Sequence, residues 1–200
     1  MGFKRVVFRE KNIFINAVEI SKGICKSKLN HGDTAVDCTM GNGNDTAFLC
    51  DLVGDNGRVY AFDIQDDAIR NTRKRLQELK FHERAQLILD GHENIDKYIK
   101  ENVRLIIFNL GYLPKGDHNI TTKKETTIKA VEKCLGILEH NGIILLIIYP
   151  GHENGRLEKE VLETFTSTLS QKEYNVVRIS FANQVNNPPE LICIEKVCLK

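Results

Sequence analysis

The sequence has 200 residues, of which 42% are hydrophobic and 28% are charged, and its formal net charge is +1. This length and balance predict one globular domain at residues 14–200, preceded by a short leader at residues 1–13. A net charge so close to zero argues against a protein that holds nucleic acid by bulk charge, so any nucleic-acid contact should be a local patch.

Short β-rich apolar runs alternate with longer amphipathic segments along most of the chain. The predicted strands are Thr34–Cys38, Arg58–Asp63, Ala85–Asp90, Val103–Asn109, Ile143–Tyr149, Tyr174–Phe181 and Glu190–Val197. The predicted helices are Phe14–Leu29, Asp45–Leu52, Asp66–Leu79, Ile95–Lys100, Lys123–Leu138 and Gly155–Leu169. Continuous apolar runs such as LIIFNL and IILLII are typical of strands covered on both faces, which favours a parallel sheet.

Alternation of strands and helices predicts an α/β fold with right-handed crossovers. Residues 182–189 leave no room for a long helix between the last two strands, which should therefore pair antiparallel at one edge. Five βα units followed by such a hairpin resemble the chain order of the Rossmann-like class I methyltransferase fold. The sequence therefore predicts a seven-stranded sheet that is mostly parallel, with one antiparallel edge hairpin.

The cysteines and apolar runs indicate the compartment. None of the six cysteines forms a CxxC pair and several lie in apolar runs, so we expect reduced core residues. The longest apolar run, Ile143–Tyr149, is too short to span a bilayer, and the basic segment Met1–Glu10 does not resemble a signal peptide. We expect a cytoplasmic protein without membrane contact.

The run AVDCTMGNGNDT, from Ala35 to Thr46, leads a strand into a Gly-x-Gly turn that opens a helix. Such a turn lets a ligand approach the backbone and presents free N–H groups. The dinucleotide fingerprint fails because Thr46 stands at the third glycine position, and no Walker lysine follows. An acidic strand end with polar neighbours suits the carboxylate and ammonium of S-adenosylmethionine (SAM); a plain structural turn is the alternative. The predicted contacts are Asp37, Thr39, Gly41, Asn42, Gly43, Asn44 and Asp45.

The next two strand ends extend this predicted site. Asp63 can accept hydrogen bonds from both ribose hydroxyls, although it could instead begin the cap of the helix at Asp66. After the third strand, Asp90 or a nearby backbone group could meet the adenine amino group, and His92 could lie against the ring or be a solvated loop histidine. Open α/β sheets bind ligands at this carboxyl edge. The predicted nucleoside contacts are Asp63, Ile64, Gln65, Asp90, Gly91 and His92.

The fourth predicted strand ends at Asn109, which would emerge beside the sulfonium of SAM. Amino methyltransferases commonly carry Asn/Asp-Pro-Pro-Tyr/Phe here; the sequence resembles that motif at Asn109 and Tyr112, with Leu110-Gly111 between them. A side-chain oxygen can aim an amine at the methyl group, and Tyr112 can stack on a base. A strand-end cap is the alternative for Asn109. His118 and His152 are candidate bases or structural residues, and we expect no metal.

Together these residues resemble the small bacterial YtqB-type family of class I SAM-dependent methyltransferases, long labelled rRNA methylases, from Phe14 onward. The resemblance is carried by DCTMGNGNDT (37–46), FDIQ (62–65), NLGYLP (109–114), GDH (116–118), YPGH (149–152) and NPP (187–189). Thr39, in place of a glycine, belongs to the family's pattern. Members called MnmM methylate the aminomethyl group of 5-aminomethyl-2-thiouridine at the tRNA wobble position. The resemblance implies SAM contacts at Asn42, Asn44, Asp63, Gln65, Gly91 and His92, with the amine near Asn109 and Tyr112.

The leading hypothesis is therefore N-methylation of a wobble uridine side chain in the tRNA anticodon. The alternatives are an rRNA methyltransferase, a small-molecule methyltransferase and a nucleotide-binding module without catalysis; Asn109 and Tyr112 argue against the last. RNA binding requires positive surface, and the candidates are Lys22, Lys26, Lys28, Arg70, Arg73, Lys74, Arg75, Lys115, Lys123 and Lys124. Anticodon recognition would fall to loops or to a second subunit of a homodimer.

Overall fold

A computed structural model describes residues 14–111 and 122–197 of the chain. Its strands are β1 (Thr34–Asp37), β2 (Arg58–Asp63), β3 (Ala85–Leu89), β4 (Val103–Asn109), β5 (Leu138–Ile148), β6 (Tyr174–Ile179) and β7 (Glu190–Lys196). Its helices are α1 (Ala17–Lys28), α2 (Asn44–Val53), α3 (Asp66–Glu78), α4 (Ile95–Tyr98), α5 (Lys124–Ile137) and α6 (Glu153–Ser167). Two 3₁₀ turns, η1 (His82–Arg84) and η2 (His92–Asn94), flank β3.

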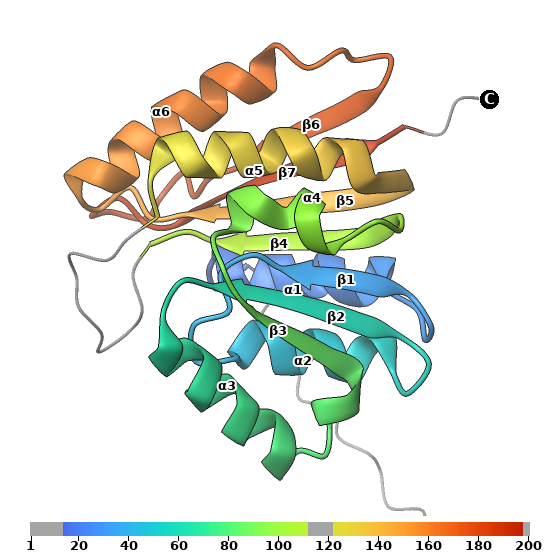
Figure 1. Ribbon diagram of the computed structural model, residues 1–200. Helices are drawn as coiled ribbons and strands as arrows, with labels where there is room; N and C mark the ends of the chain where they lie inside the picture. Colours follow the sequence, from blue (N-terminus) through green and yellow to red (C-terminus); the bar gives the residue numbers. More distant parts are fainter. Residues whose placement is uncertain (1–13, 112–121, 198–200) are drawn as a thin grey trace, which may run out of the picture.

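The strands form one sheet in the order β3-β2-β1-β4-β5-β7-β6 (Figure 1). Strands β1 to β5 pair in parallel. Strand β7 lies antiparallel between β5 and β6, so the β6–β7 hairpin closes one edge. This arrangement confirms the predicted seven-stranded, mostly parallel sheet with one antiparallel edge hairpin.

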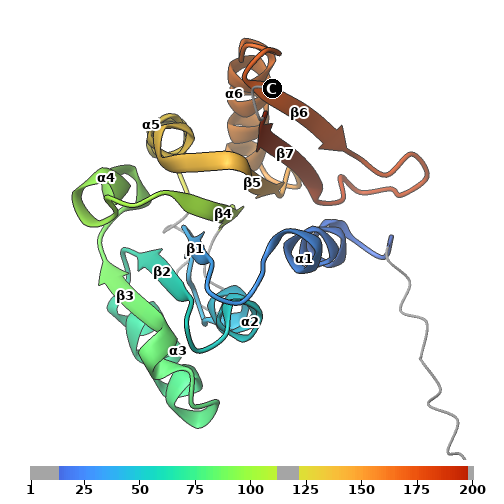
Figure 2. The same cartoon turned by 90° about the vertical axis from the view of Figure 1, so that its right-hand side faces the viewer.

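Helices cover both faces of the sheet (Figure 2). On one face α1, α2 and α3 pack against inward side chains such as Ala35 and Leu105. On the other face α4, α5 and α6 pack against side chains such as Phe62 and Phe108, both fully buried. Coverage on both faces explains why the central strands read as continuous apolar runs rather than as alternating patterns.

The two largest differences from the predicted boundaries have local physical reasons. Strand β5 begins at Leu138, because Leu138 pairs with Val103 before the register shifts and Leu105 pairs with Ile143. The polar run between Leu138 and Ile143 hides this start in the sequence. Helix α1 begins at Ala17, because the Asn16 side chain accepts the Glu19 N–H at 2.8 Å and caps the helix there.

The cysteines that the structure describes lie in the core, as predicted. Cys25, Cys38, Cys50, Cys134 and Cys193 are buried and free, whereas Cys198 lies outside the described residues. Within the two described ranges no helix is long and apolar enough to cross a membrane. The predicted leader at residues 1–13 also lies outside them, so its separation from the domain stays a prediction.

Candidate functional site

The polar ends of β1, β2 and β4 meet at the carboxyl edge of the sheet. Asp37 pairs with Ala61 of β2 and with Ile107 of β4, two residues before Asp63 and Asn109 respectively. Thr39, two residues beyond Asp37, therefore stands between Asp63 and Asn109. The structure thus brings these side chains together at the sheet edge where the sequence predicts a SAM-binding crevice, and the crevice itself stays a prediction.

Asp37 lies beneath the Gly-x-Gly turn with its side chain fully buried. Its carboxylate accepts hydrogen bonds from the Thr39 N–H at 3.1 Å and from the Thr46 hydroxyl at 2.7 Å. Burial, followed by the charge of Asp45, raises the pKa of Asp37 from 3.8 to about 7. Asp37 thus braces the turn against the first turn of α2, and its direct contact with a ligand stays a prediction.

The turn owes its shape to its two glycines. Gly41 and Gly43 have φ angles of +52° and +73°, a region that side chains disfavour. A Cβ on Gly43 would also lie 2.6 Å from the Thr72 hydroxyl oxygen. No side chain in the described residues caps α2 at Gly43. The first-turn N–H groups of α2 are therefore available to an anionic group.

Helix α3 holds this turn from outside, which the sequence did not indicate. The Thr72 hydroxyl donates to the Gly41 carbonyl at 3.1 Å, and Arg75 Nε donates to the Asn42 carbonyl at 2.9 Å. The spacing of three residues places Thr72 and Arg75 on one helix face, but only the fold shows that this face meets the turn. Arg75, a candidate for contact with RNA phosphates, thus also supports the backbone of the turn.

Asp63 links the turn to the end of β2. Its carboxylate accepts hydrogen bonds from the Gly41 N–H at 2.9 Å and from the Gln65 N–H at 3.0 Å. The side chain is partly buried, and this burial raises its pKa. Each carboxylate oxygen can accept a second hydrogen bond, so Asp63 retains capacity for ribose hydroxyls. Gln65 is partly buried and Ile64 is exposed at the same strand end.

Asp90 and His92, both predicted to lie near the adenine, follow β3 and make hydrogen bonds within the chain. The Asp90 carboxylate accepts hydrogen bonds from residues that follow it in the chain, namely the Gly91 N–H, the Asn94 amide of η2 and the Tyr98 hydroxyl of α4. His92 is only 9% exposed, and its Nδ1 lies 2.9 Å from the Cys38 carbonyl. Because a carbonyl only accepts, Nδ1 carries the proton. Nε2 is then an acceptor, with no hydrogen-bond partner among the described residues.

Asn109 contacts the turn through both its main chain and its side chain. Its backbone N–H donates to the Thr39 hydroxyl oxygen at 2.7 Å, and its amide Nδ2 donates to Asp45 Oδ2 at 3.1 Å. Tyr149 joins this cluster: burial raises its pKa, the Asp45 charge adds to the rise, and a hydrogen bond from Asn109 opposes it. The sequence did offer a signal for Tyr149, because it is the polar end of the predicted strand Ile143–Tyr149. In the structure Ile147 of that strand pairs with Asn109.

The other predicted catalytic residues are less informative. His152 caps α6, because its Nδ1 accepts the Gly155 N–H at 3.0 Å. Tyr112 and His118 lie outside the described residues. The roles in stacking or proton transfer that the sequence suggests for Tyr112, His118 and His152 therefore stay predictions.

A buried carboxylate that the sequence analysis does not single out, Glu158, links α6 to the residues before and within α5. Glu158 of α6 is 3% exposed and accepts hydrogen bonds from the hydroxyls of Thr122 at 3.0 Å and Thr127 at 2.7 Å. Thr122 in turn accepts the Gly111 N–H at 3.1 Å and donates its own N–H to the Gly111 carbonyl at 3.0 Å. In the sequence, Glu158 resembles the charged residues on the solvated face of a helix.

Some basic residues predicted to meet RNA are paired within the chain. Lys22, Lys28 and Arg70 form ion pairs with Glu19, Glu195 and Asp67. Ion pairs near the surface are weak, so these contacts do not bar phosphate binding. Lys115 lies outside the described residues, while Arg73, Lys74 and Lys123 are exposed. The RNA surface stays a prediction.

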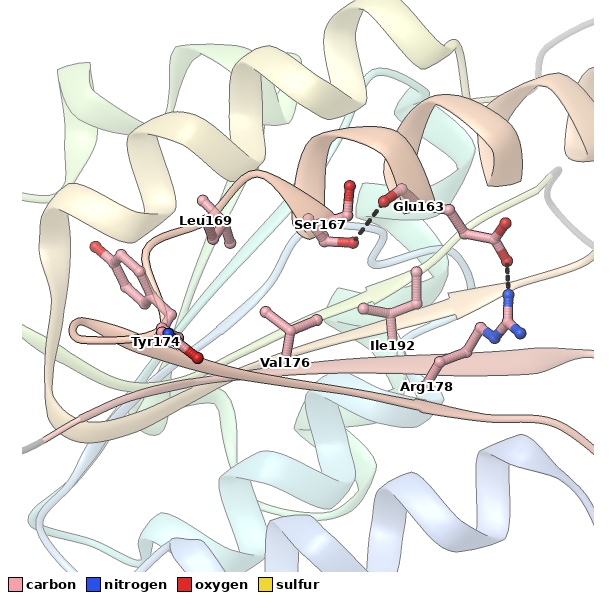
Figure 3. A pocket seen from close by; sticks show the side chains of 9 residues that line it. Glu163, Ser167, Leu169, Tyr174, Val176, Arg178 and Ile192 are labelled. Carbon is pink, nitrogen blue, oxygen red and sulfur yellow. Dashed lines mark hydrogen bonds and ion pairs between the residues drawn. The ribbon is translucent and has the colours of Figure 1, made fainter.

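Away from the crevice, a groove of about 400 Å³ separates the end of α6 from β6 and β7. Figure 3 shows Arg178 of β6 paired with Glu163 of α6 along this groove, at 2.6 Å. Its lining includes Leu169 and Tyr174 and contains no predicted site residue. Among the residues that the structure describes, no group of three or more His, Cys, Asp or Glu side chains could hold a metal ion.

Residues 59–195 match the family model described as "Putative rRNA methylase". The chain is 38% identical over 178 residues to a chloroplastic tRNA (mnm(5)s(2)U34)-methyltransferase of Arabidopsis thaliana. That match covers 84% of this chain and 65% of the plant protein, so the chain spans slightly less than two thirds of this curated relative.

Two solved structures resemble the chain along nearly all of their length. A "putative rRNA-methylase" from Clostridium thermocellum is 52% identical, with a TM-score of 0.90, over 91% of this chain and 98% of that one. A "putative methyltransferase" from Streptococcus mutans, solved in complex with SAH, is 40% identical, with a TM-score of 0.84 and the same coverage of both chains.

Proposed function

Because the chain belongs to the family described as "Putative rRNA methylase", we propose that it is a SAM-dependent N-methyltransferase acting on RNA. The family resemblance seen in the sequence is thereby confirmed. As substrate we propose the aminomethyl group of 5-aminomethyl-2-thiouridine at the tRNA wobble position. The activity for which the Arabidopsis relative is named supports this choice, as does the amine-orienting residue type at Asn109.

The residues of the crevice fit SAM. The uncapped start of α2 suits the carboxylate of its methionine part, and Asp63 retains acceptor capacity for the ribose hydroxyls. His92 Nε2 is a buried acceptor without a hydrogen-bond partner among the described residues, and its ring is held at the Cys38 carbonyl, just after β1. When bound, SAM supplies a methyl group on a sulfonium, which is already a strong electrophile. The chain itself has to align the acceptor amine and keep it deprotonated.

One observation carries the proposal: Asn109 is hydrogen-bonded to two residues of the turn, Thr39 and Asp45. An amide held beside a SAM-binding turn can accept an N–H from an amine and direct its lone pair at the methyl group. A module that only bound nucleotide would have no use for such an amide.

Mass spectrometry of tRNA nucleosides tests the substrate. In cells that lack this gene we expect 5-aminomethyl-2-thiouridine to accumulate and its methylated form to disappear. Wild-type protein should restore methylation, whereas Asn109→Ala should not. An unaltered tRNA profile would reject the proposed substrate. Loss of a methylated nucleoside from rRNA digests of the same cells would favour the rRNA alternative instead.

We further propose that the anticodon region is the part of tRNA bound, by a cytoplasmic protein that acts as a homodimer. The exposed residues Arg73, Lys74 and Lys123 are available for phosphates. Light scattering of the purified protein with and without an anticodon stem-loop measures its molar mass and tests the dimer. Calorimetric titration with that stem-loop and with an unrelated RNA hairpin compares the two affinities and tests anticodon recognition. A monomer in both samples would refute the dimer, and equal affinity for an unrelated RNA hairpin would refute anticodon recognition.

A further inference from the structure

Two hydrogen bonds join the turn after β1 to the end of β4. Thr39 accepts the Asn109 backbone N–H at 2.7 Å, and Asp45 accepts the Asn109 side-chain amide at 3.1 Å. On the basis of the proposed function, we propose that Thr39 and Asp45 are positioning residues that fix the direction of the Asn109 amide oxygen toward the acceptor amine. Their part in the reaction is then exerted through Asn109 rather than through SAM alone.

Asp45 decides which way round the amide lies. A primary amide presents an oxygen acceptor on one side and an NH₂ donor on the other, whereas a carboxylate presents acceptors only. With Nδ2 of Asn109 on Asp45 Oδ2, the bond is charge-assisted. The flipped amide would instead place two acceptor oxygens against each other. The amide oxygen of Asn109 is therefore directed away from Asp45.

Thr39 holds the backbone from which this amide projects. Strands β1 and β4 pair as far as Asp37 and Ile107, and the Cys38 N–H continues the ladder to the Ile107 carbonyl at 2.9 Å. The next main-chain donor, the Asn109 N–H, is received by the Thr39 hydroxyl instead. A glycine at position 39 would leave this donor without that partner. This hydrogen bond is a physical reason for a threonine at position 39 in place of the usual glycine.

Tyr149, the residue directly after β5, also lies near the Asn109 amide. A hydrogen bond from Asn109 opposes the rise that burial and Asp45 cause in the pKa of Tyr149. Asp45 already holds the amide NH₂ of Asn109, so the amide oxygen is the group left for an amine N–H of the substrate, as alignment of a nitrogen lone pair requires.

A measurement without substrate tests this directly. In protein labelled with ¹⁵N at asparagine, solvent exchange of the Asn109 side-chain amide protons can be followed by nuclear magnetic resonance. We expect exchange to be about tenfold faster in Asp45→Ala, as the loss of a hydrogen bond to a charged group implies. The exposed Asp51→Asn of the same helix should leave it unchanged. Unchanged exchange in Asp45→Ala would overturn the assignment, whether or not the proposed substrate is correct.

A double-mutant cycle separates action through Asn109 from action on SAM. Asp45→Asn permits either orientation of the amide, so we expect the single-turnover rate to fall by about tenfold. In an Asn109→Ser background the same change should cost less than about twofold. Both rates are measured at saturating SAM, and calorimetry should show that Asp45→Asn changes the dissociation constant for SAM by the same factor in both backgrounds, since a direct contact of Asp45 with SAM does not depend on Asn109. Equal losses in both backgrounds, or a loss confined to SAM affinity, would refute the positioning role.

Thr39 has its own matched pair of variants. Thr39→Val removes the hydroxyl at nearly constant volume and should lower the single-turnover rate, while Thr39→Ser should restore most of it. Failure of serine to rescue would show that threonine acts through its methyl group instead. If wild-type protein methylates no tRNA, the proposed substrate fails, yet amide exchange in Asp45→Ala still decides whether Asn109 is fixed in this way.

Discussion

The Asp37 carboxylate accepts a hydrogen bond from the Thr46 hydroxyl at 2.7 Å, nine residues further along the chain. Thr46 stands at the position that fails the dinucleotide fingerprint, where a glycine would bring helix and strand close together. Here a hydroxyl occupies that place and satisfies a buried acid. The departure from the fingerprint is therefore part of how this turn is held, and Asp37 and Thr46 are both fully buried.

We expect Asp37→Asn to flatten the pH dependence of stability. Because burial raises the pKa of Asp37 from 3.8 to about 7, the folded state retains a proton that the unfolded state releases in this window. Stability should therefore fall as the pH rises from about 4 to about 7. Asparagine carries no charge to desolvate, and it can still accept from Thr39 and donate to Thr46.

Urea unfolding of both proteins at several pH values measures this difference. The free energy of unfolding of the wild-type protein should decline across the window, and that of Asp37→Asn should decline less. Parallel curves for the two proteins would assign the dependence to other groups.

The strand and helix order was predictable because each central strand is buried on both faces, which leaves runs such as Leu105–Phe108 without polar interruption. The start of β5 was not, because it depends on Leu138 pairing with Val103 across a register shift. No local pattern encodes that pairing. The polar residues that follow Leu138 resemble a turn, and only the neighbouring strand makes them part of the sheet.

Within the site, Asp63 and Asn109 were predictable because each ends an apolar strand with a polar residue. Asp45 was predicted as a SAM contact, yet its hydrogen bond to Asn109 joins residues 64 positions apart. Glu158 was missed for a related reason: its partners, Thr122 and Thr127, lie before and within α5. Such long-range polar pairs depend on how helices and loops dock, which single-sequence patterns do not specify.

Asn109→Ala should separate catalysis from cofactor binding. We expect its dissociation constant for SAM to stay near that of the wild type, because Asp63 and the start of α2 are unaltered. Turnover should fall by about 100-fold or more, since the amine loses its aligning oxygen. Calorimetry with SAM and single-turnover methylation of tRNA measure the two quantities. Loss of SAM binding in this variant would mean that Asn109 serves the cofactor instead.

Asp63→Ala should weaken SAM binding, in contrast to Asn109→Ala. The Asp63 carboxylate holds the Gly41 and Gln65 N–H groups and is expected to receive the ribose hydroxyls. SAM binding should weaken by about 1–3 kcal/mol, the range for a lost hydrogen-bonded charge. Asp63→Asn keeps one acceptor oxygen and should lose less. Unaltered affinity of Asp63→Ala for SAM in a calorimeter would move the ribose site elsewhere.

Thr127→Val should destabilise the fold through Glu158. The Thr127 hydroxyl donates to Glu158 at 2.7 Å, and both side chains are buried. Valine has nearly the same volume but leaves one carboxyl oxygen unsatisfied, so we expect a loss of about 1–3 kcal/mol in the free energy of unfolding. The pKa of Glu158, already raised by burial, should rise further because a donor to its carboxylate is gone.

The matched control for this change is Thr164→Val on the exposed side of α6. The Thr164 hydroxyl donates to the Glu160 carbonyl at 2.8 Å in contact with solvent. Water can replace that bond, so we expect a change within about 0.5 kcal/mol. Urea denaturation of both variants against wild type decides the matter. Equal effects of the two substitutions would mean that helix propensity, and not the buried carboxylate, governs the loss.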